Sequence, residues 1–221
     1  MRSKLLIFEM QRIAGVLFIL LSLMGKAQTP TTIAYSHDYE FKEGVYLTIE
    51  QFLGNNPILK SKIVSDIPKT QIDFLTQLLE HKTFTTKDTS GAEHKIETNS
   101  IWGYCQNRTI YFYFNNEFIR LNVIGNLSLF SGIVVHSTTH TEPIGDMYAI
   151  EPSFEELHQF VLDTRSDKVL DFDSENMEMI LKNDAELYAQ FMKLKKRAKA
   201  NSIFIYLRKY NEKYPLYLPS N

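Results

Sequence analysis

The stretch that decides the fold is Ile101–Val135, IWGYCQNRTIYFYFNNEFIRLNVIGNLSLFSGIVV. Runs of β-branched and aromatic residues alternate in it with short polar breaks at Gln106-Asn107-Arg108, Asn115-Asn116 and Gly125-Asn126. Such runs predict strands, and closely spaced Asn and Gly residues predict tight turns between antiparallel neighbours. The same pattern extends in both directions, so the sequence predicts an antiparallel meander over residues 83–150.

The meander is preceded by residues with helical patterns. Thr48-Ile49-Glu50-Gln51 matches a capping box, in which the Thr48 hydroxyl and the Gln51 side chain satisfy backbone donors at the start of a helix. Apolar residues between Ile72 and Leu79 recur at helical spacing and predict a second short helix. Residues 28–40 are polar and irregular, and we expect a loose leader there.

Helical patterns also follow the meander, after a predicted edge strand at Met147–Ile150. Ser153-x-x-Glu156 predicts a cap for a helix that carries Phe154, Leu157 and Val161 on one face. A short helix is predicted around Met177, Ile180 and Leu181, then a longer one capped by Asn183-x-x-Glu186, and helical spacing continues to Tyr210. The fold class is therefore α+β: one domain over residues 28–221, with an antiparallel β-meander packed on one face by N-terminal short helices and C-terminal helices.

The N-terminus has the pattern of a signal peptide. Basic residues precede an uninterrupted apolar run at Ile13–Leu21, and small residues occupy positions 25 and 27. With its extension to Met24 the run is about twelve residues, which as a helix spans only about 18 Å of a hydrocarbon core of about 30 Å. The sequence predicts cleavage after Ala27 and a periplasmic or secreted product without a transmembrane segment. Glu9 interrupts the basic lead-in, which leaves initiation at Met10 as an alternative.

Composition narrows the classes of function. The chain has 221 residues, 44% of them hydrophobic, and a formal net charge of −2. Nucleic-acid binding needs a clear basic excess, so no nucleic-acid partner is expected. Cys105 is the only cysteine, in an apolar stretch, and the sequence predicts a buried side chain without a disulfide.

One group of residues has the donor types of a metal site. His136-x-x-x-His140-x-Glu142 combines two imidazoles with a carboxylate. Residues four apart in an extended chain lie about 13 Å from each other, so they share an ion only if a loop folds them together. Solvated loop residues are the first interpretation, and metal ligation by His136, His140 and Glu142 is the alternative.

The aromatic run Tyr111-Phe112-Tyr113-Phe114 places rings on both faces of its strand, whereas a half-exposed strand alternates with polar residues. Coverage of the second face by the C-terminal helices is one explanation. The other is a groove, lined by Tyr111 and Tyr113, that holds an apolar or sugar ligand.

No motif for nucleophilic catalysis, phosphate binding or dinucleotide binding is present, and the sequence predicts no cofactor. The absence of these motifs favours a non-catalytic envelope protein that binds another protein or a surface component. The alternative is a hydrolase, or a lipid- or sugar-handling enzyme, whose site assembles only in the fold.

Several short segments together resemble a family of uncharacterised exported proteins, a domain of unknown function, from Bacteroidetes-type bacteria. They are Glu43–Leu47, Ile101–Cys105 with the aromatic strand after it, Asp184–Tyr188 and the ending Tyr210–Tyr217. The resemblance implies a bacterial envelope setting and carries no activity, ligand or catalytic residue.

Overall fold

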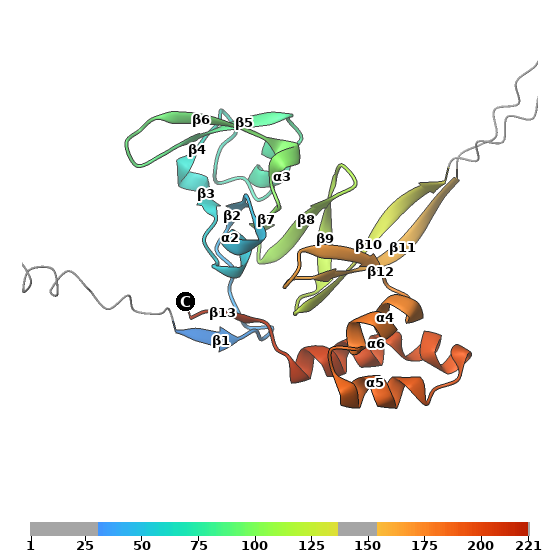
Figure 1. The fold of residues 1–221 in the computed structure, drawn as a ribbon. Helices are drawn as coiled ribbons and strands as arrows, with labels where there is room; N and C mark the ends of the chain where they lie inside the picture. The colour runs from blue at the N-terminus through green and yellow to red at the C-terminus, as the bar shows by residue number, and fades with distance from the viewer. Residues whose placement is uncertain (1–30, 137–153, 221) are drawn as a thin grey trace, which may run out of the picture. The chain divides into compact units, whose positions relative to one another are not determined.

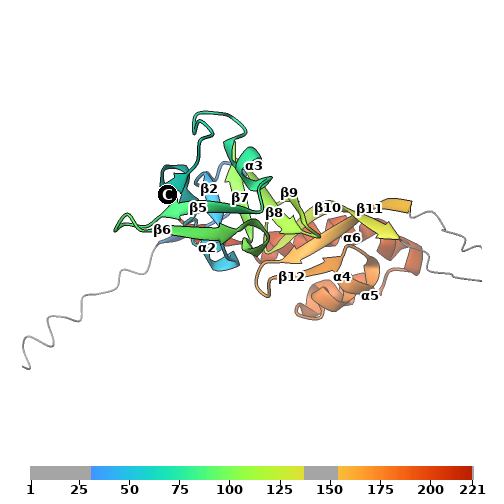
Figure 2. The ribbon, with the colours of Figure 1, turned by 90° about the horizontal axis from the view of Figure 1, so that it is seen from above.

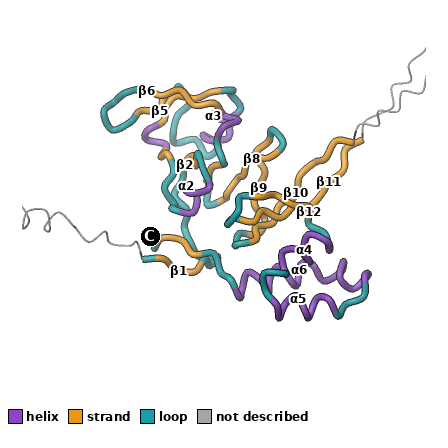
Figure 3. The backbone as a smooth tube through the Cα atoms, viewed as in Figure 1, coloured by secondary structure: helices purple, strands orange, loops and turns teal. Residues whose placement is uncertain are grey.

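The computed structural model describes residues 31–136 and 154–220 (Figure 1). The strands are β1 Thr32–Ala34, β2 Gly44–Tyr46, β3 Ile58–Leu59, β4 Ile63–Val64, β5 Thr83–Lys87, β6 Glu93–Glu97, β7 Gly103–Gln106, β8 Thr109–Phe114, β9 Glu117–Val123, β10 Leu127–His136, β11 Phe154–Asp163, β12 Lys168–Asp171 and β13 Tyr217–Pro219. The α-helices are α2 Ile49–Leu53, α3 Phe74–Leu79, α4 Ser174–Leu181, α5 Ala185–Met192 and α6 Lys196–Lys213. Antiparallel sheets with helices against them confirm the predicted α+β class (Figure 3). The predicted edge strand at Met147–Ile150 lies outside the described residues.

The largest sheet contains the predicted meander. Its strand order is β12-β11-β10-β9-β8-β7-β2-β3, and neighbouring strands are antiparallel. The turns Asn107-Arg108 and Asn115-Asn116 join β7 to β8 and β8 to β9, and all four residues have positive φ. Two consecutive residues with positive φ form the type I′ turn, whose twist matches that of paired strands. The predicted turns and strands of this region are confirmed.

The large sheet curls around an aromatic core. Alternate residues of the central strands point into this core, and the sheet side chains in it are Tyr46, Cys105, Ile110, Phe112, Leu121, Phe130, Phe160 and Leu162. Phe52 of α2 and Leu218 of β13 are buried among them. The turn between β11 and β12 reaches the start of β7, where the Trp102 indole donates a hydrogen bond of 3.1 Å to Asp167. Opposite ends of the sheet are therefore tied together.

The outer face of the large sheet is covered in two parts. At the β2–β7 end, Val45 and Tyr104 pack with α3 and with Phe84 of the small sheet β4-β5-β6. At the β10–β12 end, Leu127, Leu129 and Val161 pack against α4, α5 and α6 (Figure 2). Helices α3 to α6 therefore share the outer face, as expected, and α2 is the exception because its Phe52 packs in the aromatic core on the other face. The central strands carry apolar residues at consecutive positions, so both faces of the sheet are apolar and each needs cover.

The segment Phe154–Asp163 is a strand, and the helix predicted there is wrong. All ten of its residues pair with β10, from His136 opposite Phe154 to Leu127 opposite Asp163. Of the three residues that suggested helical spacing, Phe154 and Leu157 are exposed and only Val161 is buried. The buried residues instead alternate, because Phe160 and Leu162 face the aromatic core while Val161 faces α4–α6. Pairing with a neighbouring strand thus overrides the local pattern.

Caps define the helices on both sides of the meander. The predicted capping box of α2 is confirmed: the Thr48 hydroxyl accepts from the Gln51 amide, and the Gln51 side chain accepts from the amide of Leu47. The predicted long helix after residue 183 is instead two helices, because α5 ends at Met192 and α6 begins at Lys196. The cap of α5 is Asp184 and not Asn183, since the Asp184 carboxylate accepts from two backbone amides.

Asp184 also joins α5 to the end of α6. Its buried carboxylate lies 2.7 Å from the Lys213 ammonium and accepts a hydrogen bond of 2.9 Å from the Tyr214 hydroxyl. Lys213 first, and then the backbone amide of Leu187, lowers the pKa of Asp184 from 3.8 to about 2. A carboxyl group whose pKa is lower in the folded state stabilises the fold above its unfolded pKa, and this contribution disappears as pH falls through the folded value.

We therefore expect Asp184→Asn to reduce the free energy of unfolding near neutral pH. The difference from the wild type should narrow as pH falls from about 4 to about 2, the interval between the ordinary and the lowered pKa of Asp184. Urea unfolding at a series of pH values measures this difference. Asp66→Asn, at an exposed position, is the control. A difference between Asp184→Asn and wild type that stays constant with pH would contradict the assignment.

Residues 32–40, within the expected loose leader, are held to the C-terminal end of the chain. β1 pairs with β13 antiparallel, and the Tyr35 amide donates to the carbonyl of Leu216. Tyr39 is buried in the aromatic core, and its hydroxyl donates to the carbonyl of Pro219.

Cys105 is completely buried, as predicted, and burial raises its pKa to about 12. Within residues 31–136 and 154–220, no helix has both the length and the apolar character needed to cross a bilayer.

Candidate functional site

The end of the β10–β11 hairpin carries a cluster of metal-ligand side chains. Antiparallel pairing places His136 opposite Phe154, and Glu156 opposite Val134. Residues two apart in a strand share a face, so Glu156 and His158 lie side by side, and His136 reaches Glu156 diagonally across the pair. We call His136, Glu156 and His158 the triad.

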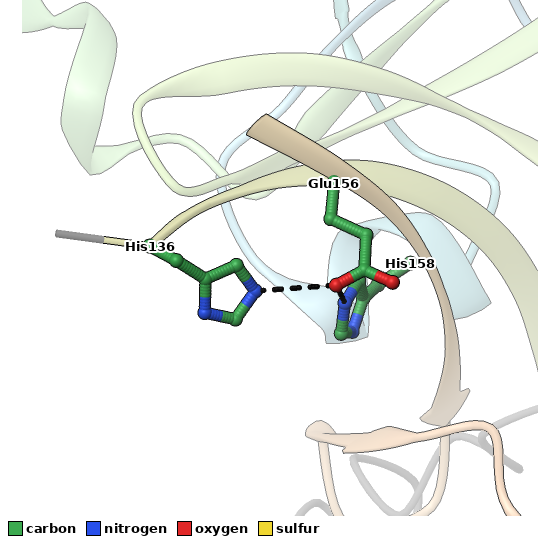
Figure 4. A group of neighbouring side chains, drawn as sticks. All are labelled: His136, Glu156 and His158. Carbon is green, nitrogen blue, oxygen red and sulfur yellow. Dashed lines mark ion pairs between the residues drawn. The ribbon is translucent and has the colours of Figure 1, made fainter. Parts of the chain in front are cut away.

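The three side chains of the triad point toward one another, with the carboxylate between the imidazoles (Figure 4). The Glu156 Oε2 atom lies 3.0 Å from Nε2 of His158 and 3.5 Å from Nε2 of His136. One ligand atom from each residue can be chosen so that all three lie within 4.8 Å of one another. His158 first, and to a smaller extent His136, lowers the pKa of Glu156 below its ordinary value.

The rings of the triad are positioned by aromatic neighbours. His136 stacks on Phe154, with ring centroids 4.9 Å apart, and His158 lies beside Phe160 of the aromatic core. Both Nε2 atoms are shielded from solvent and make no hydrogen bond of normal geometry, although both are within ion-pair distance of Glu156. Buried polar atoms without partners are uncommon in folded proteins, and each calls for an explanation.

The predicted metal ligands agree with the triad at one position. His136 is a member, whereas His140 and Glu142 lie outside the described residues. Glu156 and His158 were missed because their segment was predicted to be a helix. The Glu-x-His spacing would have indicated a shared face if the segment had been recognised as a strand.

The aromatic residues of β8 separate into different surroundings. Phe112 is buried in the aromatic core, and Phe114 packs against it. Tyr111, on the outer face, stacks on Tyr104 with ring centroids 4.7 Å apart and an interplanar angle of 10°. The neighbours of Tyr111 belong to the α3 side of the sheet, so the expectation that the C-terminal helices cover this strand is wrong. Tyr113, one step along the same face, borders a cavity.

This cavity, which we call the Tyr113 groove, has a volume of about 920 Å³. It is formed by the end of α3, the ends of β5 and β6, and the β8–β9 turn. Its lining residues are Leu79, Glu80, His81, Lys82, Thr83, Glu97, Thr98, Asn99, Tyr113, Asn116, Glu117 and Phe118. The rings of Tyr113 and Phe118 have centroids 5.0 Å apart and are tilted by 56°. Of the two residues predicted to line a groove, Tyr113 borders this cavity and Tyr111 is not among its lining residues.

Residues 44–214 match the profile of a family described as a family of unknown function (DUF6563). No curated protein and no solved structure matches the chain.

Proposed function

The chain belongs to the family of unknown function DUF6563, and we propose that it is an exported, non-catalytic protein that binds a neutral glycan of the cell envelope in the Tyr113 groove. Export is supported by the basic lead-in, the apolar run Ile13–Leu21 and the small residues before Gln28. The observation that carries the proposed binding function is the groove itself, which combines exposed ring surface with hydrogen-bonding side chains.

The chemistry of the lining suits a ligand rich in hydroxyl groups. The C–H face of a sugar packs against an aromatic ring, and Tyr113 and Phe118 supply such rings. Hydroxyl groups both donate and accept hydrogen bonds, and the side-chain amides of Asn99 and Asn116 do the same. The volume is at the upper end of the roughly 300–1,000 Å³ found for small-ligand sites.

The charge of the lining separates neutral from anionic ligands. The carboxylates of Glu80, Glu97 and Glu117 border the groove, whereas Lys82 is the one permanently charged cation among its lining residues. Carboxylates accept hydrogen bonds from hydroxyl groups and repel anionic groups at short range. A neutral or amino sugar therefore fits the groove better than a phosphorylated or uronic-acid glycan.

Replacing Tyr113 by alanine is expected to weaken glycan binding about tenfold, because loss of an aromatic stacking surface costs on the order of 1–1.5 kcal/mol. Immobilised neutral envelope glycans identify the ligand, and calorimetry with that glycan measures the dissociation constant. Tyr113→Phe retains the ring and is expected to bind nearly as well as the wild type.

Tyr217→Ala is the matched control, because this exposed tyrosine lies on β13 and outside the groove lining. Equal loss of affinity in Tyr113→Ala and Tyr217→Ala, or no binding of any neutral glycan, would argue against the proposal. Release of shorter saccharides during incubation would favour the alternative of a sugar-handling hydrolase.

A further inference from the structure

We propose that the triad of His136, Glu156 and His158 is a binding site for a divalent transition-metal ion, with zinc as the reference ion. The triad residues are not among those that line the Tyr113 groove, so this inference does not depend on the proposed glycan binding.

The spacing of the donor atoms suits one small ion. Zinc binds imidazole nitrogen and carboxylate oxygen at about 2.0–2.1 Å, and in tetrahedral geometry this places neighbouring donors about 3.3 Å apart. The Glu156 oxygen lies 3.0 Å and 3.5 Å from the two imidazole nitrogens, on either side of that value. One ligand atom of each residue can be chosen so that all three lie within 4.8 Å of one another, so an ion needs only a small adjustment of the exposed Glu156 carboxylate and the half-buried rings.

The two imidazole Nε2 atoms have the Glu156 carboxylate as their shared ion-pair partner. Nε2 of His136 and Nε2 of His158 are shielded from solvent and lack a hydrogen bond of normal geometry. An ion between the rings and the carboxylate would satisfy both nitrogen atoms at once. Stacking on Phe154 and packing beside Phe160 restrict the two rings, so little side-chain entropy is lost when they bind.

The donor set selects the class of ion. Imidazole nitrogen suits zinc, copper, nickel and iron, whereas magnesium and calcium prefer sites made of oxygen ligands. Two histidines and one carboxylate leave at least one coordination position without a ligand from the triad, as in zinc sites that hold a water or a substrate. The carboxylate also offsets part of the positive charge that a divalent ion brings.

The test is calorimetric titration of the mature protein with zinc chloride, after removal of metal with a chelator and without a polyhistidine tag. We expect one zinc ion per chain, with a dissociation constant in the micromolar range or below, and no binding of magnesium at the same concentration. His136→Ala, Glu156→Gln and His158→Ala should each weaken zinc binding about 100-fold or more. Loss of a ligand should exceed the roughly 10–100-fold effect of losing an outer-shell partner.

Two further measurements keep the result unambiguous. His94→Ala removes another exposed histidine that faces a carboxylate, that of Asp88 at 3.0 Å, and should leave zinc binding unchanged. Circular dichroism shows whether each variant is folded, and Glu156→Gln replaces an exposed side chain by one of similar size and shape. Absence of stoichiometric zinc binding, or binding that survives in all three triad variants, would overturn the proposal and leave the triad as a pair of surface ion pairs.

Discussion

Alanine in place of Phe130 is expected to lower the free energy of unfolding by about 3–5 kcal/mol. Phe130 is fully buried at the centre of the aromatic core, with ring centroids 5.7 Å from Phe112, 5.2 Å from Phe114 and 5.4 Å from Phe160. Removal of its ring leaves a cavity between three rings from two other strands, and surroundings held in a paired sheet relax into such a cavity only in part. In a domain of this size the melting temperature should fall by about 6–20 °C.

Phe204→Ala provides the matched comparison, because Phe204 lies on α6 with 44% of its surface exposed. That substitution should change stability by no more than about 0.5 kcal/mol. Denaturant unfolding of both variants, followed by the fluorescence of the single tryptophan Trp102, measures the difference. If Phe130→Ala and Phe204→Ala lower the free energy of unfolding equally, burial of Phe130 in the aromatic core does not stabilise the fold as expected.

Gly103→Ala should lower the free energy of unfolding by about 3 kcal/mol or more. Here the cause is a steric clash of the added methyl group, whereas in Phe130→Ala it is a cavity. Gly103 lies in β7 opposite Phe112, and a Cβ atom at this position would overlap the backbone carbonyl of Tyr111. A carbonyl within a ladder cannot move aside as a side chain does, so β7 and β8 would have to separate. Amide hydrogen exchange should show lost protection in these two strands first.

Gly132→Ala tests the same substitution where the obstacle is flexible. Its added Cβ would lie 3.0 Å from the terminal Cδ1 atom of Ile119, which can change rotamer. We expect a cost below about 1 kcal/mol for Gly132→Ala, measured by the same urea unfolding. Comparable losses at Gly103 and Gly132 would show that the close approach of β7 and β8 is not what requires glycine.

Local patterns predicted the centre of the fold well. The turns at Asn107-Arg108 and Asn115-Asn116 were predicted because asparagine tolerates the positive φ that a two-residue hairpin turn requires. The cap at Thr48 was predicted because a hydroxyl and an amide three residues apart satisfy backbone donors in one local arrangement. These features depend on neighbouring residues alone, and therefore the sequence displays them directly.

The errors concern features that depend on distant residues. Phe154–Asp163 has apolar residues at spacings that fit a helix, and only its pairing with β10 makes it a strand. That error concealed the triad, because on a helix the side chains of Glu156 and His158 diverge, whereas on a strand they share a face. Tyr113 and Phe118, which both line the groove, are paired across the predicted Asn115-Asn116 turn, whereas Asn99 follows β6 and no local pattern brings it to Tyr113.

The pairing of β1 with β13 has a consequence for biosynthesis. Among the described strands, β1 leaves the ribosome first and its partner β13 leaves last. Tyr39 and Leu218 lie in one aromatic core. Tyr39 therefore cannot reach its native packing until Leu218 has been synthesised. A domain in which the first described strand pairs with the last therefore cannot complete its fold until β13 has been synthesised.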